Sequence, residues 1–349
     1  MNFASDNVVG VHPRILHALV DANDGAQESY GADDYTAHAT QRLREVFETD
    51  LQAFLVTTGT AANSLCLATI TPPFGAVLCH VDAHIMVDEC GAPEFFTGGA
   101  KLIGIDQPGG KLTPAGVQRV LDGFVRGEHD PLPAAISIAQ ASELGTVYTP
   151  SEIAALADIA HRNDMRLHMD GARFANALVS LGCSPAEMTW QAGVDALSFG
   201  GTKNGAMILE AVTLFAPDLA DGFARRRMKA GQLLSKGRYL GAQLQAYLAD
   251  DLWLDTARQA NDMAARLARG LATNAKIRLP LPTHANEVFA IMPRSLFDRL
   301  QHTGVHFYEW PGAGPGTDTI GSDEIFARFV CAFTTTTEGV DRLVAATQD

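Results

Sequence analysis

Short runs of apolar and β-branched residues alternate with longer helical patterns along the first two thirds of the chain. The helical patterns are clearest over 60–70, 114–126 and 150–163, and the last follows Thr149, a residue that commonly caps a helix start. Seven apolar runs predict strands, at 53–58, 76–80, 101–105, 134–140, 166–170, 195–200 and 210–216. This alternation is typical of an α/β fold with a mostly parallel sheet covered by helices.

The pattern changes after about residue 230. Long amphipathic helical segments follow, the longest over 254–272, and a short α+β tail comes after them. The sequence therefore predicts three parts: an N-terminal arm at 1–14, a large domain at 15–240 and a smaller C-terminal domain at 241–349.

Composition and charge narrow the class of protein. The formal net charge of −14 disfavours a nucleic-acid partner, and the one dense basic run, 225–229, is typical of a solvated helix face. No apolar run approaches the roughly 18 residues that span a bilayer, so we expect no membrane partner and a cytoplasmic location. The five cysteines lack metal-ligand spacing, so neither zinc nor disulfides are expected.

Ligands of an open parallel sheet collect at the carboxyl ends of its strands. Three of the predicted strands have residues at or just after this end that could bind a ligand or take part in catalysis. Gly59 and Thr60 open the helix after 53–58, where free backbone N–H groups favour an anion such as a phosphate. Asp170 ends the strand at 166–170, and Arg173 follows closely enough to hold a carboxylate. Taken singly, each of these residues is also compatible with a plain helix cap or turn.

Lys203 lies on the glycine-rich turn "GGTKNG" after the strand at 195–200. A desolvated lysine favours its neutral amine, which is the nucleophile of Schiff-base chemistry, although a lysine that only closes a turn has the same sequence signature. A phosphate cradle, a carboxylate and an amine are together what pyridoxal 5'-phosphate (PLP) requires: the carboxylate pairs with the pyridine nitrogen and the amine with the aldehyde.

Eight segments in order also resemble the threonine aldolase family, within the PLP-dependent aldolases and β-eliminating lyases of the aspartate-aminotransferase fold (fold type I). They are "SDN" (5–7), "YGADD" (30–34), "TGTAAN" (58–63), "AHIMVDECGAPE" (83–94), "LHMDGARFANA" (167–177), "FGGTKNG" (199–205), "KAGQLLSKGRYL" (229–240) and "RFVC" (328–331). The resemblance covers nearly the whole chain.

The resemblance implies a role for each matching residue. Lys203 carries the cofactor, Asp170 pairs with the ring nitrogen, and His84 stacks on the ring, so these three are the expected catalytic residues. The residues expected to bind the cofactor are Gly59, Thr60, His84, Asp170, Arg173, Lys203 and Lys229, the last reaching the phosphate from a neighbouring subunit. The residues expected to bind the substrate, including its carboxylate, are Ser5, Tyr30, Arg173 and Arg328. No metal ligand is expected.

The same resemblance implies a homotetramer, a dimer of dimers with active sites shared between chains, and Tyr30 is expected at the junction.

The chain departs from the family pattern at the residue expected to act as the general base. Many family members carry a second histidine after the fourth strand, where this chain has Ser142 or Glu143. His84, or a water that it orients, is the expected acceptor of the β-hydroxyl proton. Asp88 and Glu89 either share the proton transfer or are surface or capping acids.

The expected activity is retro-aldol cleavage of a β-hydroxy-α-amino acid to glycine and an aldehyde. The substrate would be of the L-threonine, L-allo-threonine or phenylserine type. A PLP-dependent β-eliminating lyase is the alternative within the fold, and a non-catalytic PLP-binding or regulatory protein is the alternative from another class. A nicotinamide-dependent enzyme is disfavoured because no G-x-G-x-x-G follows the first strand.

Overall fold

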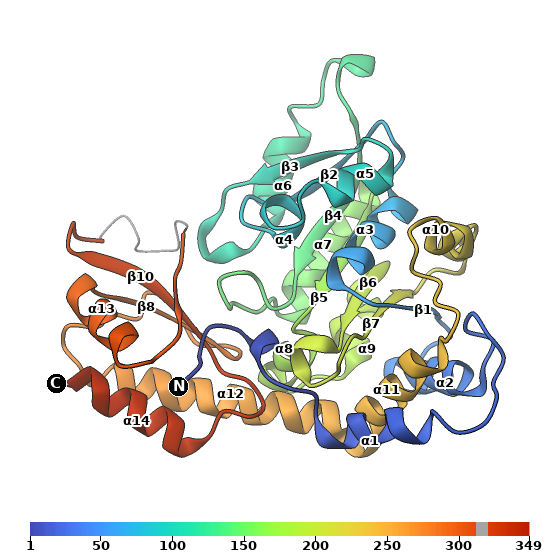
Figure 1. Ribbon diagram of the computed structural model, residues 1–349. Helices are drawn as coiled ribbons and strands as arrows, with labels where there is room; N and C mark the ends of the chain where they lie inside the picture. The colour runs from blue at the N-terminus through green and yellow to red at the C-terminus, as the bar shows by residue number, and fades with distance from the viewer. Residues whose placement is uncertain (312–319, 349) are drawn as a thin grey trace.

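A seven-stranded sheet forms the centre of the larger part of the protein, as the computed structural model of residues 1–311 and 320–348 shows (Figure 1). The strand order is β1-β7-β6-β5-β4-β2-β3, and β7 is antiparallel to both of its neighbours while the other pairs are parallel. The strands are β1 (Gln52–Val56), β2 (Gly75–His80), β3 (Lys101–Ile105), β4 (Leu132–Ala139), β5 (Arg166–Gly171), β6 (Ala196–Gly200) and β7 (Glu210–Leu214). All seven predicted strands are confirmed, as is the mostly parallel sheet.

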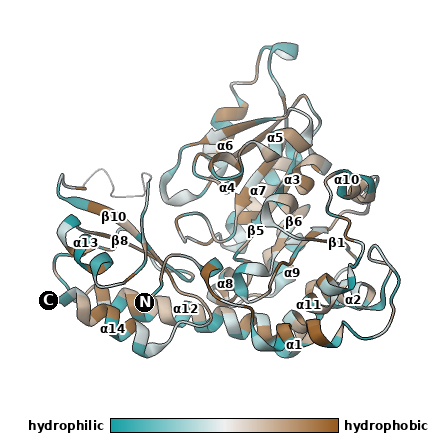
Figure 2. Cartoon of the chain, viewed as in Figure 1, coloured by the Kyte–Doolittle hydropathy of each residue, from teal (hydrophilic) through white to brown (hydrophobic). Residues whose placement is uncertain are grey.

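Helices cover both faces of this sheet because its strands are apolar on both sides. One hydrophobic cluster gathers α2, α7, α8 and α11 under one face, and another gathers α3 and part of α10 on the opposite face. Hydropathy colouring shows the apolar residues of the strands enclosed between these layers (Figure 2). The helices are α1 (Pro13–Asp21), α2 (Asp34–Phe47), α3 (Gly59–Ile70), α4 (His84–Val87), α5 (Ala92–Thr97), α6 (Pro114–Leu121), α7 (Pro150–Arg162), α8 (Phe174–Leu181), α9 (Pro185–Met188), α10 (Phe223–Lys229) and α11 (Arg238–Leu248).

The helix predicted over 114–126 is shorter than expected. It ends at Leu121, because Gly123 weakens helix propagation and its N–H turns back to the carbonyl of Val120. The helices predicted at 60–70 and 150–163 are confirmed within one residue as α3 and α7. In α7, Thr149 and Glu152 form a reciprocal capping box that satisfies two backbone N–H groups at the helix start.

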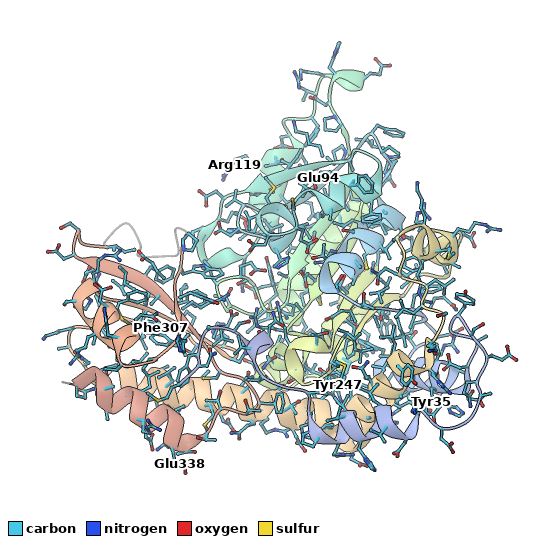
Figure 3. All side chains as sticks on the ribbon, in the orientation of Figure 1. Tyr35, Glu94, Arg119, Tyr247, Phe307 and Glu338 are labelled. Atoms are coloured by element: carbon cyan, nitrogen blue, oxygen red, sulfur yellow. The ribbon has the colours of Figure 1, made fainter. Side chains whose placement is uncertain are left out.

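A long helix, α12 (Leu252–Leu271), connects the two hydrophobic cores. Its first turns place Trp253 and Ala257 in the larger core, and its last turns place Leu267 and Leu271 in the core of the C-terminal part. That second core packs under a small antiparallel sheet of order β8-β10-β9, and Phe307, labelled in Figure 3, lies within it. Its elements are β8 (Glu287–Pro293), α13 (Arg294–His302), β9 (Tyr308–Glu309), β10 (Glu324–Val330) and α14 (Thr337–Gln348).

The N-terminal arm lies between these two parts of the molecule (Figure 1). Phe3 is buried in the C-terminal core, and its backbone bonds to His306 and Val330. A short 3-10 turn, η1 (Asp6–Val8), follows and packs against the turn that carries Lys203. The predicted domain boundary at residue 241 stays a prediction, and the hydrophobic side chains change from one core to the other within α12.

No helix of residues 1–311 and 320–348 is long and apolar enough to cross a membrane. The same residues contain no group of three or more His, Cys, Asp or Glu side chains arranged to hold a metal ion. All five cysteines are unpaired thiols, and Cys66, Cys79 and Cys331 are buried.

Candidate active site

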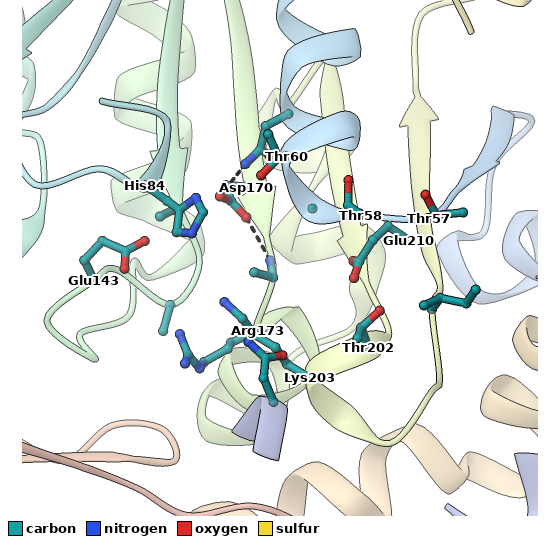
Figure 4. Close-up of a pocket in the computed structure, with 17 residues that line it drawn as sticks. Thr57, Thr58, Thr60, His84, Glu143, Asp170, Arg173, Thr202, Lys203 and Glu210 are labelled. Atoms are coloured by element: carbon teal, nitrogen blue, oxygen red, sulfur yellow. Dashed lines mark hydrogen bonds between the residues drawn. The ribbon is translucent and has the colours of Figure 1, made fainter. Parts of the chain in front are cut away.

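A cavity of about 350 Å³ opens at the carboxyl ends of β4, β5 and β6, next to the start of α3 (Figure 4). Its volume is in the range of small-molecule sites. It brings together six of the predicted site residues: Gly59, Thr60, His84, Asp170, Arg173 and Lys203. The other lining residues are Asn7, Thr57, Thr58, Asn63, Ala139, Ala141, Glu143, Ala172, Thr202, Ile208 and Glu210.

The start of α3 presents free N–H groups to this cavity. Thr58 caps the helix, its hydroxyl accepting from the N–H of Ala61. Within the part of the chain that the structure describes, the N–H groups of Gly59 and Thr60 have no hydrogen-bond partner. Together with the positive end of the helix dipole, they form a site suited to a phosphate.

Asp170 is fixed at the end of β5 by two hydrogen bonds, both drawn in Figure 4. Its Oδ1 accepts from the N–H of Ala172 at 3.0 Å, and its Oδ2 accepts from Asn63 Nδ2 at 2.8 Å. Asn63 lies on the first turns of α3, so one helix supplies both the anion-binding N–H groups and the amide that orients the carboxylate. The side chain is only 8% exposed, which keeps water from competing for these bonds.

The same asparagine links Asp170 to His84. Asn63 Nδ2 also donates to Glu89 Oε1 at 2.9 Å, and that oxygen lies 2.8 Å from His84 Nδ1. The hydrogen bond that His84 donates to the Glu89 carboxylate, followed by the charges of Glu143 and Asp170, raises the pKa of His84 against the opposing effect of burial. Glu89 is therefore a buried partner of the histidine. The alternative prediction, that Glu89 is a surface acid, is wrong.

Lys203 lies on a tight turn after β6. Hydrogen bonds from Gly201 and Thr202 to the carbonyl of Leu209 close the turn, and Asn204 anchors it by donating to the Tyr247 hydroxyl. The Lys203 amine lines the cavity and makes no hydrogen bond or ion pair with any residue of the described ranges. An amine that is held in place and left unpaired is available for reaction with a carbonyl group.

Gly200 allows the end of β6 to lie close to the residues that follow Asp170. Residues Asp170 and Ser198 are paired on β5 and β6, and Gly200 ends β6 immediately before the lysine turn. A methyl group at Gly200 would lie 2.7 Å from the carbonyl oxygens of Gly171 and Ala172. Only glycine permits this approach of the two chain segments.

Arg173 is already engaged in a buried ion pair. Its Nε donates to Asp6 Oδ2 at 2.8 Å, its Nη2 to Asp6 Oδ1 at 3.2 Å, and Glu287 lies 3.4 Å away. Although burial opposes the charge, these two carboxylates hold the pKa of Arg173 above its ordinary value. A substrate carboxylate that reached Arg173 would have to share it with Asp6.

Four of the predicted residues do not line the cavity in the single chain. Ser5 caps η1 by accepting from the N–H of Asn7, which itself reaches the cavity. Arg328 is linked to the site through Glu287 at 3.4 Å and stacks 3.9 Å over the Trp310 ring, and its buried Nε has no partner among residues 1–311 and 320–348.

Tyr30 and Lys229 are the other two. Tyr30 is 55% exposed, and Lys229 is an exposed residue at the end of α10. Their roles toward a neighbouring subunit stay predictions.

Two acidic residues line the cavity without having been singled out as site residues. Glu210, at the start of β7, is 7% exposed, and burial raises its pKa to about 7. Glu143 was one of two candidates for the place of the missing histidine, and the structure points it, rather than Ser142, into the cavity. The sequence gives no indication that Glu210 belongs to the site, because it only precedes an apolar run, as many residues at the start of a strand do.

A phosphate-binding helix start, an oriented carboxylate and an unpaired lysine amine meet at the carboxyl edge of the sheet. These features fit pyridoxal phosphate, and they define the class of PLP-dependent enzymes of fold type I. The sequence profile of the beta-eliminating lyase family matches residues 2–294. The chain belongs to this family.

Comparison with individual proteins agrees with that assignment. The chain is 43% identical to the low specificity L-threonine aldolase of Pseudomonas aeruginosa over 342 residues, which cover 98% of this chain and 95% of that protein. It superposes on the threonine aldolase of Leishmania major with a TM-score of 0.92 at 27% identity, covering 99% and 98% of the two chains. The serine palmitoyltransferase of Sphingomonas wittichii shares the fold, with a TM-score of 0.72 at 14% identity over 100% of this chain and 86% of that one.

Proposed function

We propose that the protein is a PLP-dependent aldolase that cleaves a β-hydroxy-α-amino acid to glycine and an aldehyde. The observation that carries this proposal is the unpaired Lys203 amine facing the same cavity as Asp170 and the start of α3. The names of the similar proteins support L-threonine as a substrate, and L-allo-threonine and phenylserine remain expectations from the sequence.

The roles of the side chains follow from where they lie. Gly59 and Thr60 bind the phosphate through their free N–H groups, Asp170 pairs with the ring nitrogen, and Lys203 forms the covalent link. The bound cofactor supplies a conjugated ring that stabilises the electron pair left at Cα when a bond to that carbon breaks. Asn63 keeps Asp170 oriented, because its amide bonds one carboxylate oxygen directly.

The substrate carboxylate determines which bond breaks. Holding it fixed would orient the Cα–Cβ bond for cleavage, and such orientation can account for a large part of the lowering of the barrier. Arg173 and Arg328 are the cations of the proposed carboxylate site. Arg328 is the less satisfied of the two, since its contacts to Glu287 and to the Ala4 carbonyl are both 3.4 Å long and its Nε is unpaired within the described part of the chain.

Features beyond a single chain are also part of the proposal. Tyr30 and Lys229 are exposed in the single chain, as residues that complete a neighbouring active site would be before assembly. This exposure supports a homotetramer with shared active sites, which stays a prediction. The cytoplasmic location is a separate prediction.

The experiment that tests the function is product identification. The PLP-loaded protein is incubated with both threonine diastereomers and with phenylserine, and the products are separated and identified. We expect glycine and the matching aldehyde. Release of a keto acid and ammonia would instead show the β-elimination that the family name describes, and a PLP-bound protein inert to every amino acid would refute both readings.

A further inference from the structure

Glu143 is a carboxylate that lines the cavity and has no role in the mechanism described so far. Its side chain is half-buried and lines the cavity, and it makes no hydrogen bond or ion pair with any described residue. Figure 4 shows it on the same side of the cavity as His84, with Lys203 and Arg173 across from it. A partly buried acid without a structural partner is costly, so its place in the fold requires a functional explanation.

The loop after β4 is held by the residues on either side of Glu143. The Ser142 hydroxyl bonds inward to the Thr146 hydroxyl at 2.7 Å and accepts from the N–H groups of Leu144 and Thr146. Leu144 is buried in a separate apolar cluster under the small sheet. Because its two neighbours are committed to the loop and to that cluster, Glu143 alone of the three is directed at the cavity.

The two candidate bases differ in their capacity to accept a proton. His84 Nδ1 is committed to Glu89, so only Nε2 remains, and the raised pKa of His84 favours the imidazolium form in which Nε2 also carries a proton. Glu143 has two free oxygens. Burial raises its pKa, while the charges of Lys203, His84 and Arg173 oppose that rise, which leaves a carboxylate more basic than one in water.

We propose that Glu143 accepts the proton of the substrate β-hydroxyl, and that His84 positions the reacting groups without acting as the base. This inference rests on the aldol cleavage proposed above. The O–H bond breaks and its proton passes to the Glu143 carboxylate as the Cβ=O bond of the aldehyde forms. The Cα–Cβ bond breaks and its electron pair stays with Cα. One proton is then added at Cα to give glycine, and Glu143 returns its proton to solvent. The protons removed from and added to the substrate are therefore balanced.

The test compares two reactions of the same variant, Glu143→Gln. Cleavage of L-threonine needs a base for the β-hydroxyl, whereas exchange of the glycine α-proton with deuterium does not, because glycine has no β-hydroxyl. We expect kcat/KM for cleavage to fall about 100-fold or more, the lower range for loss of a general base. Glycine exchange and the PLP dissociation constant should stay within about threefold of wild type, which also shows that the variant is folded and loaded.

The pH profile gives a second readout. Wild-type kcat/KM should rise with pH as Glu143 loses its proton, among Lys203, His84, Arg173 and Asp170, and that rise should disappear in Glu143→Gln. The matched control is Glu128→Gln, which removes a carboxylate from an exposed turn and should leave both reactions unchanged.

Three outcomes would overturn the assignment. They are full cleavage activity in Glu143→Gln, loss of cleavage and glycine exchange together, and an acid limb that survives in this variant but vanishes in His84→Gln. Failure of the wild-type protein to release glycine and aldehyde would refute the proposed function itself, so the two failures are distinguishable.

Discussion

Replacing Glu210 by glutamine should make the protein more stable at alkaline pH. Glu210 is 7% exposed at the edge of the cavity, and no described residue forms an ion pair with it. Burial raises its pKa from an ordinary 4.5 to about 7, against the smaller opposing effects of Thr202 and Lys203. The folded protein thus keeps a proton on Glu210 over a pH range in which the unfolded chain has lost it.

The sign and size of the effect follow from that difference. Below pH 4.5 Glu210 is protonated in both the folded and the unfolded state, so the full stability of the fold is present. Between pH 4.5 and about 7 the unfolded chain loses this proton while the folded protein keeps it, so the free energy of unfolding falls as the pH rises. Each pKa unit corresponds to about 1.4 kcal/mol, so the wild-type protein should lose about 3 kcal/mol over this interval relative to a neutral isostere. For a chain of this size, that corresponds to a Tm difference of about 5 °C.

The assay is thermal unfolding of the cofactor-free protein at pH 5, 6.5 and 8, followed by circular dichroism. The Tm of Glu210→Gln should exceed that of wild type by only about 1 °C at pH 5 and by about 5 °C at pH 8. Glu128→Gln, on an exposed turn, serves as the control and should show no such trend. A Tm difference that does not depend on pH, or a variant less stable than wild type at pH 8, would refute the reasoning, because the buried charge would then be well compensated.

The remaining predictions concern the groups around the cavity. Lys203→Ala should form no borohydride-reducible bond to PLP, as measured by mass spectrometry, and a reduced adduct in this variant would move the covalent link elsewhere. Asp6→Asn leaves Arg173 buried with one carboxylate fewer and should cost about 3 kcal/mol; an unchanged Tm would show that Glu287 suffices. Gly200→Ala should cost about 1–3 kcal/mol by overpacking and weaken PLP binding, and wild-type values of both quantities would contradict the contact described above.

The sequence determined the features that depend on neighbouring residues in the chain. The alternation of apolar runs with helical patterns was sufficient for all seven strands of the large sheet, because the strand period and the helix period are local properties. The chemistry at the strand ends was also readable, since Asp170 lies at the end of a strand and Gly59 and Lys203 each come within three residues of one. Parallel strands then bring their carboxyl ends to one edge of the sheet, so the meeting of these residues followed from topology.

Tertiary structure alone decided which side chains are paired. Asp6 and Arg173 are separated by 167 positions, and nothing local in either segment indicates that they neutralise each other. The same holds for Asn63, which joins Asp170 to Glu89 and His84 from a different helix.

The difference between Ser142 and Glu143 was also beyond the sequence. Both follow the fourth strand, and only the packing of the loop shows that one hydroxyl is consumed internally while the adjacent carboxylate faces the cavity. The burial of Glu210 has the same origin. Local periodicity therefore determines where the backbone goes, whereas partner, exposure and proton affinity depend on side chains that approach from distant parts of the chain.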